Sequence, residues 1–500
     1  MEINVTSDAI TSVKTGAIIL GYFEGTERLT GELADADKAL DGAVSQLITL
    51  GEIKGKAKEM TLIHTLGKLP GPRLVIIGLG KQAELNLNTT RGALAEACRS
   101  LRHKCADSIA TTALGAGVNG ISPESAAQAI AEGAMLGLYS FRTHLTRKEN
   151  NHTDVKQLLI VGNNADKPAL ERGLAKGRIL AEAANLARNM VNEPANYMTP
   201  SLLAEAAVKL ANEHGLEVTV FEREKMAELG MGALLGVAQG SRQPPKFIIL
   251  TYKGKPSDEI DVALVGKGIT FDTGGISLKP PEGMEKMKGD KAGGVAVIAA
   301  MGAIARLKPK INVTALIPAT ENMPGGNAMK PGDILTAITG ETIEVISTDA
   351  EGRLILADAL GYAVQHKARR IIDVATLTGA CRIALGDLCT GAMGNNQELM
   401  NRIIAAGNDT GELMWQLPMY DDYREKLKSD SADIKNVGGP LGGAITAAKF
   451  LADFVGNTPW VHLDIAATSM SDKEKGHLVK GATGVPVRTL ISLVLSLAES

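Results

Sequence analysis

Aromatic side chains are scarce in this sequence of 500 residues, in which Phe, Trp and Tyr together make up 3%. Proteins that bind single-stranded nucleic acid stack bases on such rings, so their scarcity argues against that role. The formal net charge of −3 likewise provides no basic excess that would attract phosphate groups. We therefore predict that nucleic acid is not a main partner, and a local basic patch stays open as a minor role.

Long hydrophobic runs are also missing. The longest, residues 292–305, is shorter than the roughly 20 residues of a membrane-spanning helix and predicts a buried helix instead. The N-terminal residues 1–4 show no basic start followed by an apolar run, so no signal peptide is expected. These absences predict a cytoplasmic protein without a membrane partner.

Cysteine is rare, and the four cysteines form no CxxC pair. They are Cys98, Cys105, Cys381 and Cys389. Four scattered thiols in a chain of this length are too few for a disulfide framework and are typical of a reducing compartment. We expect them to be small buried side chains.

The apolar runs that are present predict an α/β fold of two domains. Strand-like runs at 16–20, 74–78 and 158–162 alternate with helical composition such as 90–103, which predicts a smaller N-terminal α/β domain over 1–165. Helical composition at 168–191 predicts a connecting helix within 166–192. Residues 193–500 then form the larger C-terminal domain.

In the C-terminal part, β-branched runs repeatedly lead into polar or glycine-rich loops. Such runs lie at 260–266, 311–318, 342–347 and 371–376. In open α/β sheets the ligand site lies beyond the carboxyl ends of the strands. We therefore look for the chemistry at these junctions.

Two of the junctions are rich in charge. The first carries Lys267, Asp272, Lys279 and Asp290. The second carries Asp349, Glu351 and Arg353, which share one side if the segment is extended, and a helix is expected over 354–365.

Four carboxylates in one cleft would repel one another and take up protons unless cations lie between them. Hard or borderline divalent ions such as Mg²⁺, Mn²⁺ or Zn²⁺ suit carboxylate ligands, and shared carboxylates can bridge two ions. No HExxH pattern occurs among the eight histidines, which excludes that single-zinc protease pattern.

More ordinary explanations exist for each of these residues. An aspartate at a helix start is more often an N-cap than a metal ligand. Asp272-Thr273-Gly274 matches the aspartic-protease triplet, but those enzymes are all-β proteins, and the alternating α/β pattern of this sequence does not suit them. Spacing alone therefore leaves the metal site and helix capping both open.

Residues 347–354 read STDAEGRL, one residue away from the NTDAEGRL signature of the leucyl aminopeptidase (cytosol aminopeptidase) family. Four further stretches resemble family blocks: GKGITFDTGGISLKP at 266–280, ENMP at 321–324, ATLTGA at 375–380 and WVHLDIA at 460–466. The resemblance is dense over about residues 170 to 495. It implies a smaller non-catalytic N-terminal domain and a C-terminal catalytic domain with a mixed sheet flanked by helices.

The resemblance also implies the roles of individual residues. Lys267, Asp272, Asp290 and Glu351 would hold one divalent ion, the tighter one, and Asp272, Asp349 and Glu351 the other. Lys267 would have to be neutral, which a neighbouring dication favours. Lys279 and Arg353 would be catalytic, with bicarbonate bound at Arg353. Met287, Thr376, Leu377 and Gly379 would bind the substrate.

The implied activity is metal-dependent release of N-terminal Leu and other apolar residues from peptides with a free N-terminus. Mn²⁺ or Zn²⁺ are the expected ions, with Mg²⁺ as a third candidate. The free α-amine of the substrate would bind one ion, which explains specificity for chain ends. The family also implies a homohexamer built from two trimers.

The sequence departs from the family pattern at three positions: Ser347 replaces Asn, Lys291 replaces Met and Ala467 replaces Gly. Because Lys291 adds a cation beside ligand Asp290, we expect Lys291→Met to raise metal affinity, and unchanged metal titration curves would refute this. Two rival functions remain: a two-metal phosphoesterase, which would more often use histidine ligands, and a binding protein that keeps the fold.

Overall fold

The computed structural model describes residues 1–102, 104, 106–147 and 154–499. The chain forms two compact units. The first comprises Met1–Glu182 and Asp472–Lys480, and the second comprises Ala183–Ser471 and the chain from Gly481 onward. Helix α5 (Lys167–Asn192) begins in the first unit and ends in the second.

A six-stranded sheet forms the centre of the first unit. Its order is β1 (Glu2–Thr6), β6 (Gln157–Val161), β5 (Ser108–Thr112), β2 (Ala17–Tyr22), β4 (Arg73–Gly78) and β3 (Met60–His64). Neighbouring strands are parallel except for the edge strand β3, which pairs antiparallel with β4.

Helices cover both faces of this sheet, because its strands are apolar on both sides. Along β2, Ile18 and Leu20 face α1 (Gly31–Ala39) and α2 (Ala43–Thr49), whereas Ile19 packs with α3 (Leu87–Arg102) and α4 (Pro123–Gly137). The segment Asp472–Lys480 joins the unit through the Gly476 N–H, which donates to Glu96 Oε1 at 2.8 Å.

The second unit is built on a nine-stranded mixed sheet. Its order is β16 (Met414–Gln416), β15 (Thr390–Gly394), β18 (Trp460–Asp464), β14 (Ile371–Ala375), β9 (Val262–Gly266), β11 (Asn312–Asn322), β8 (Lys246–Lys253) and β7 (Glu217–Phe221), with β10 (Gly268–Asp272) paired to β11. The central strands β18, β14, β9 and β11 are parallel. Their carboxyl ends therefore lie at one edge of the sheet, where β10 also ends beside β11.

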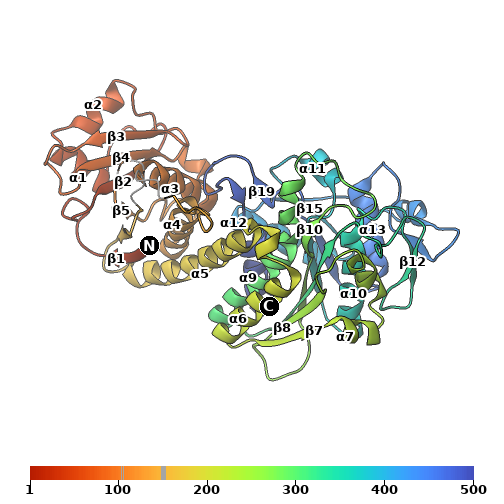
Figure 1. Ribbon diagram of the computed structural model, residues 1–500. Helices are drawn as coiled ribbons and strands as arrows, with labels where there is room; N and C mark the ends of the chain where they lie inside the picture. The colour runs from red at the N-terminus through yellow and green to blue at the C-terminus, as the bar shows by residue number, and fades with distance from the viewer. Residues whose placement is uncertain (103, 105, 148–153, 500) are drawn as a thin grey trace. The chain divides into compact units, whose positions relative to one another are not determined.

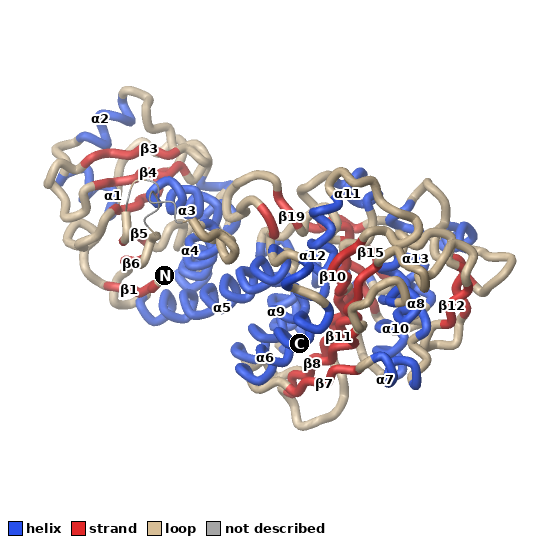
Figure 2. Tube along the Cα trace, in the orientation of Figure 1, coloured by secondary structure: helices blue, strands red, loops and turns tan. Residues whose placement is uncertain are grey.

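Two groups of helices enclose this sheet. Figure 2 shows the strands β10, β11 and β15 between α9 on one side and α10 on the other. The first group is α6 (Pro200–His214), α9 (Ala292–Leu307), α12 (Gln397–Thr410) and α14 (Val487–Ala498), and the second is α8 (Gly232–Ala238), α10 (Glu351–Gln365) and α13 (Gly443–Asp453). Figure 1 labels most of these elements along the chain.

Shorter elements complete the second unit. They are the helices α7 (Arg223–Glu228) and α11 (Gly379–Leu385), the 3-10 helices Ala195–Tyr197, Met284–Lys291 and Asp421–Leu427, the small sheet of β12 (Ile334–Thr336), β13 (Thr342–Glu344) and β17 (Ile434–Lys435), and the pair β19 (Met470–Ser471) and β20 (Gly481–Ala482). A further 3-10 helix, Gln82–Glu84, lies in the first unit.

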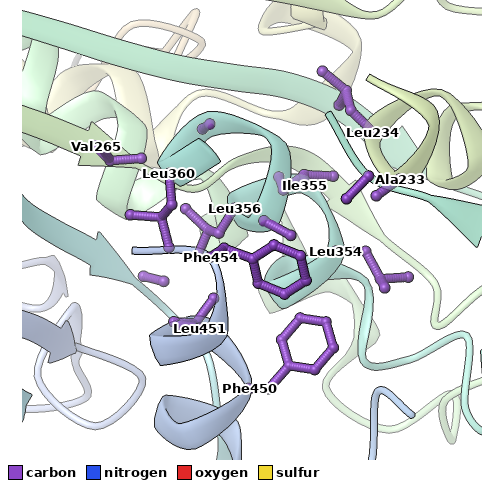
Figure 3. Packing of buried hydrophobic residues seen from close by; sticks show 14 of the residues in the cluster. Ala233, Leu234, Val265, Leu354, Ile355, Leu356, Leu360, Phe450, Leu451 and Phe454 are labelled. Atoms are coloured by element: carbon purple, nitrogen blue, oxygen red, sulfur yellow. The ribbon is translucent and has the colours of Figure 1, made fainter. Parts of the chain in front are cut away.

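Helix α10 is held in place by the core of the second unit. Leu356 and Leu360 of α10 lie among Phe450 of α13, Phe454 directly after that helix and Val265 of β9 (Figure 3). Burying one such side chain contributes about 1.5–3 kcal/mol. This packing fixes the helix whose first turn carries two of the predicted site residues, Glu351 and Arg353.

The fold confirms the predicted α/β class with two domains, the larger having a mixed sheet flanked by helices. The boundaries at 165 and 192 stay a prediction. The buried helix expected over 292–305 is α9. The strand expected over 342–347 ends at Glu344, and the helix expected from 354 begins at Glu351, so the extended geometry assumed for residues 349–353 is wrong.

The structure can be compared with the predictions about membrane spans and cysteines. No helix among the described residues is long and apolar enough to cross a membrane. Cys98 and Cys381 are buried free thiols, and Cys389 is a half-buried one. Burial raises the pKa of the Cys98 thiol to about 12. Cys105 lies outside the described residues.

Candidate metal centre and active site

A cavity of about 450 Å³ lies at the carboxyl edge of the second sheet. It brings together every residue that the sequence predicted for the site: Lys267, Asp272, Lys279, Met287, Asp290, Asp349, Glu351, Arg353, Thr376, Leu377 and Gly379. Lys267 and Thr376 directly follow β9 and β14, and Asp272 ends β10. The convergence therefore follows from the parallel strand order.

Three carboxylates form the buried centre of the cavity. One oxygen from each of Asp272, Asp290 and Glu351 lies within 4.8 Å of the other two, and all three residues are buried. The side chain of Asp349 lies nearer the solvent, with 37% of its surface exposed. The cluster thus has a dry interior and one carboxylate that is open to water.

Two lysines lie between these carboxylates. Lys267 Nζ is 2.8 Å from Asp290 Oδ2 and 2.8 Å from Glu351 Oε1. Lys279 Nζ is 2.9 Å from Asp272 Oδ2 and 2.5 Å from Asp349 Oδ1. Each ammonium group therefore lies between two carboxylates, and the four acids define two adjacent places for positive charge.

The electrostatics of the cluster reflect crowded acids in a dry site. Burial and neighbouring carboxylates raise the pKa of Glu351 to about 8 and that of Asp290 to about 6, against the attraction of Lys267. Burial would lower the pKa of Lys267, but Asp290, Glu351 and Asp272 outweigh it and raise that pKa well above its usual range. The carboxylates retain their full charge only with strong positive charge beside them.

This donor set fits divalent metal ions. Carboxylate oxygens from several residues, together with a lysine amine that a dication can keep neutral, are ligands for hard and borderline ions. Asp272 and Glu351 each contact or approach both lysine positions. The same two carboxylates are therefore the ones placed to be shared between two ions.

Two glycines make the close packing around the cluster possible. A Cβ on Gly352 would lie 2.6 Å from Lys267 Nζ, so a larger residue there would displace the lysine. Gly274 has a φ of +85°, a conformation that favours glycine, and its N–H donates to Asp272 Oδ1 at 2.8 Å. The turn after β10 thereby orients the Asp272 carboxylate.

Arg353 is buried beside the carboxylates in the first turn of α10. Its Nη1 donates to the backbone oxygen of Asn436 at 2.6 Å, and its Nε has no hydrogen-bond partner among the described residues. Burial lowers the pKa of the guanidinium to about 10, against the attraction of Glu351 and Asp464. An unpaired buried donor on a planar cation fits a small bidentate anion such as bicarbonate.

Two segments that follow the neighbouring strands β14 and β18 line the cavity, and we call them the first wall (residues 376–379) and the second wall (residues 466–470). Thr376 Oγ1 donates to Asp290 Oδ1 at 2.6 Å, and the Thr376 carbonyl accepts from Lys267 Nζ at 3.1 Å, so the first wall is tied to the carboxylate cluster. Met287 lies in the 3-10 helix Met284–Lys291, which also carries Asp290.

Several cavity residues were missed by the sequence analysis. The second wall contributes Ala466, Ser469 and Met470, and Lys286 and Arg382 also line the cavity. The second wall follows β18. Because ligand sites in open α/β sheets lie beyond the carboxyl ends of the strands, treating residues 460–464 as a strand would have pointed to this segment.

Asn322 belongs to the ENMP stretch at 321–324, for which the family resemblance implied no individual role. It ends β11, and its Nδ2 donates to Asp272 Oδ1 at 2.8 Å and to the Thr348 carbonyl at 3.0 Å. Glu351 Oε2 lies 3.4 Å from the same nitrogen. This buried amide therefore lies against both carboxylates that are placed to be shared.

The three departures from the family pattern occupy different positions. Lys291 is fully buried, does not line the cavity, and donates to the carbonyls of Lys288 at 2.7 Å and Glu193 at 3.1 Å. Ser347 Oγ accepts from the Asp349 N–H at 3.3 Å. Ala467 belongs to the second wall, where it is buried and does not itself line the cavity. The effect of Lys291 on metal affinity stays a prediction.

Comparison with known proteins gives the family. The model for the cytosol aminopeptidase family, catalytic domain, matches residues 185–491, and the model for its N-terminal domain matches residues 19–148. The chain belongs to the cytosol aminopeptidase family. This makes it a hydrolase of the peptidase class, a metal-dependent aminopeptidase, and confirms the family resemblance seen in the sequence.

Individual relatives agree along the whole chain. Probable cytosol aminopeptidases of Alkaliphilus oremlandii and Solibacter usitatus are 45% and 48% identical, over 100% and 99% of both chains respectively. Among solved structures, a mutant of tomato leucine aminopeptidase has a TM-score of 0.88 at 34% identity, covering 99% of this chain and 96% of its own. The bottromycin maturation enzyme BotP in complex with Mn has a TM-score of 0.86 at 33% identity, covering 97% and 100%.

Proposed function

We propose that this aminopeptidase uses two divalent metal ions to release N-terminal Leu and other apolar residues from peptides. The observation that carries the proposal is the pair of adjacent cation positions formed by four carboxylates in one cavity. A single structural cation would need one such position, and a binding protein would need neither.

The ligand assignment follows the grouping of the carboxylates. Lys267, Asp272, Asp290 and Glu351 would hold the first ion, and Asp272, Asp349 and Glu351 the second. The three buried carboxylates fit a tighter site, and the exposed Asp349 fits a weaker and more exchangeable one. Mn²⁺, Zn²⁺ and Mg²⁺ are the candidate ions, and Mn is the ion named for the related BotP structure.

When bound, such ions supply Lewis acidity that activates water near neutral pH and polarises a carbonyl group. The protein groups then act around them. Lys279 Nζ, held by Asp272 and Asp349, is placed to stabilise negative charge that develops on the scissile carbonyl oxygen. Arg353 would hold bicarbonate through its unpaired Nε, and such an anion would supply a general base at this position.

The walls of the cavity support the proposed preference for an apolar first residue. Met287 and Met470 both line the cavity and offer flexible, polarisable side chains to an apolar first residue. Thr376, Leu377 and Gly379 of the first wall would hold the backbone of the substrate. Peptides with a free N-terminus are the proposed substrates.

We also propose a homohexamer in the cytoplasm. The support is family membership, together with the absence of a membrane-crossing helix among the described residues. Light scattering of the purified chain at micromolar concentration would give the mass of six chains, and a monomer mass would contradict the assembly.

Hydrolysis of leucine anilide by chelator-stripped and metal-refilled protein tests the function. Restored activity on the free-amine substrate, with none on the N-acetylated one, is expected. Hydrolysis of a chromogenic phosphate ester in place of the anilide would support a phosphoesterase instead. No hydrolysis of either substrate at confirmed metal occupancy would support a binding role.

A further inference from the structure

Asp464, the last residue of β18, is a fully buried carboxylate that contacts both walls of the cavity. Its Oδ1 accepts from the Leu377 N–H at 3.2 Å and the Thr378 N–H at 3.4 Å in the first wall. The same oxygen accepts from the Ala466 N–H at 3.1 Å in the second wall. Its Oδ2 accepts from Thr378 Oγ1 at 2.7 Å.

The segment held by Asp464 also reaches the metal cluster and a helix. Thr376 next to it is bonded to Asp290 and Lys267. Thr378 Oγ1 in turn accepts from the Cys381 N–H at 3.0 Å and caps α11. The position of the first wall therefore determines the shape of the substrate cleft, and Thr376 connects that wall to the carboxylate cluster.

We propose that Asp464 is a positioning residue that fixes the two walls of the substrate cleft relative to each other. The inference rests on the proposed function, in which the first wall binds the substrate backbone. Asp464 does not line the cavity, so it acts through the two walls and not on the substrate.

The charge and both oxygens of Asp464 are needed for this role. A carboxylate can accept all four bonds, whereas an amide offers one acceptor oxygen and an NH₂ group that cannot accept from Thr378 Oγ1. The amide oxygen can still accept from the three N–H groups on Oδ1, but more weakly than a charged carboxylate, and the Thr378 hydroxyl loses its acceptor. Asp464→Asn should therefore loosen the walls without changing the side-chain volume.

The neighbouring strand offers a matched control. Asp373 of β14 is also fully buried, and it accepts from Trp460 Nε1 at 2.6 Å and bonds His462 Nδ1 at 2.6 Å. Neither partner lines the cavity. Asp373→Asn thus tests the general cost of removing a buried carboxylate from this sheet.

Steady-state kinetics on leucine anilide and amide hydrogen exchange are measured on the full metal-loaded chain. For Asp464→Asn we expect KM to rise about tenfold, the usual scale for losing a hydrogen bond to a charged group, with a smaller change in kcat. The amides of residues 377 and 378 should lose protection from exchange. Thr378→Val should show part of both effects, and Thr378→Ser, which keeps the hydroxyl, should restore KM.

Asp373→Asn should leave KM within about twofold and the two amides protected, although unfolding becomes easier. Equal KM values for Asp464→Asn and Asp373→Asn, with unchanged exchange at residues 377 and 378, would overturn the proposal. If the wild-type chain fails to hydrolyse the anilide, the proposed function is contradicted, and the exchange data still decide whether Asp464 anchors the walls.

Discussion

At the scale of single residues, the carboxylate cluster depends on a neutral amide as well as on charged groups. Asn322 donates to Asp272 and lies 3.4 Å from Glu351, so it holds the two carboxylates that we assign to both ions. A neutral amide of this kind orients the carboxylate oxygens that would bind metal and leaves the net charge of the site unchanged. Removing such partners typically weakens metal binding.

Asn322→Ala should therefore lower metal affinity by about 10–100-fold, as measured by calorimetric titration of the stripped protein. Asn312→Ala is the matched control, because Asn312 is a buried asparagine at the other end of the same strand, and its Nδ2 donates to the Ser257 carbonyl at 2.6 Å. The control should retain wild-type affinity. Equal losses in both variants would mean that Asn322 supports the strand and not the ligands.

At the scale of elements, α10 joins the metal site to the hydrophobic core. Its first turn carries Glu351 and Arg353, and its next turns bury Leu356 among the side chains of α13 and β9. Both tryptophans of the chain, Trp415 and Trp460, lie in the second unit. Tryptophan fluorescence therefore reports the unfolding of the unit that contains this helix.

Leu356→Ala should lower the free energy of unfolding of the second unit by about 2–5 kcal/mol, the cost of a cavity at a fully buried leucine. Urea unfolding followed by tryptophan fluorescence measures this. Leu388→Ala, at a side chain that is 61% exposed, is the control and should change stability by less than about 0.5 kcal/mol. A loss of that small size for Leu356→Ala would contradict the packing described for α10.

Asp358, in α10, makes the free energy of unfolding depend on pH. Burial raises the pKa of this carboxyl to about 7, although the Leu234 and Ile338 N–H groups donate to it. The folded state thus keeps a proton that the unfolded state releases near pH 4, and the stability from Asp358 is lost as the pH rises through about 7. Asp358→Asn cannot titrate, so its stability relative to wild type should increase between pH 4 and 8.

The control for this titration is Asp261→Asn. Burial of Asp261 is outweighed by the backbone hydrogen bond from Asn312 and by Lys255, so the pKa of Asp261 lies below its ordinary value. The difference in free energy of unfolding between Asp261→Asn and the wild-type protein should therefore stay constant between pH 5 and 8. A constant difference for Asp358→Asn over the same range would show that Asp358 remains ionised in the fold.

The sequence was most informative where one strand run leads directly into one polar loop. Lys267 follows β9 as predicted, and the buried helix at 292–305 is present as α9. Thr376, predicted as the end of the run at 371–376, lies one residue after β14, and Asp272 ends β10, a strand that the sequence analysis did not predict. The β-branched run at 342–347 was predicted as a strand, and residues 349–353 as extended, but the strand ends at Glu344 and residues 345–350 follow it. This segment is a loop, in which Asn436 bonds the Ile346 N–H and the Ser347 carbonyl. A partner so distant along the chain leaves no local signal.

At the scale of the whole molecule, the two units are not divided at one point of the chain. Residues 472–480 lie between β19 and β20 of the second unit and yet belong to the first. Composition could not reveal this, because the Gly476 N–H and its acceptor Glu96 are 380 residues apart. The order of the two domains was predictable from the alternation of strands and helices. The assignment of residues 472–480 to the first unit was not.

The central claim is that one chain holds two divalent ions through unequal sets of carboxylates. Metal content per chain, measured by mass spectrometry after equilibration with Mn²⁺ or Zn²⁺, tests it most directly. The wild-type protein should retain two ions, and Asp349→Ala, which removes only the exposed ligand, should retain one. A wild-type content of one ion, or the same content in both proteins, would contradict the two-ion account.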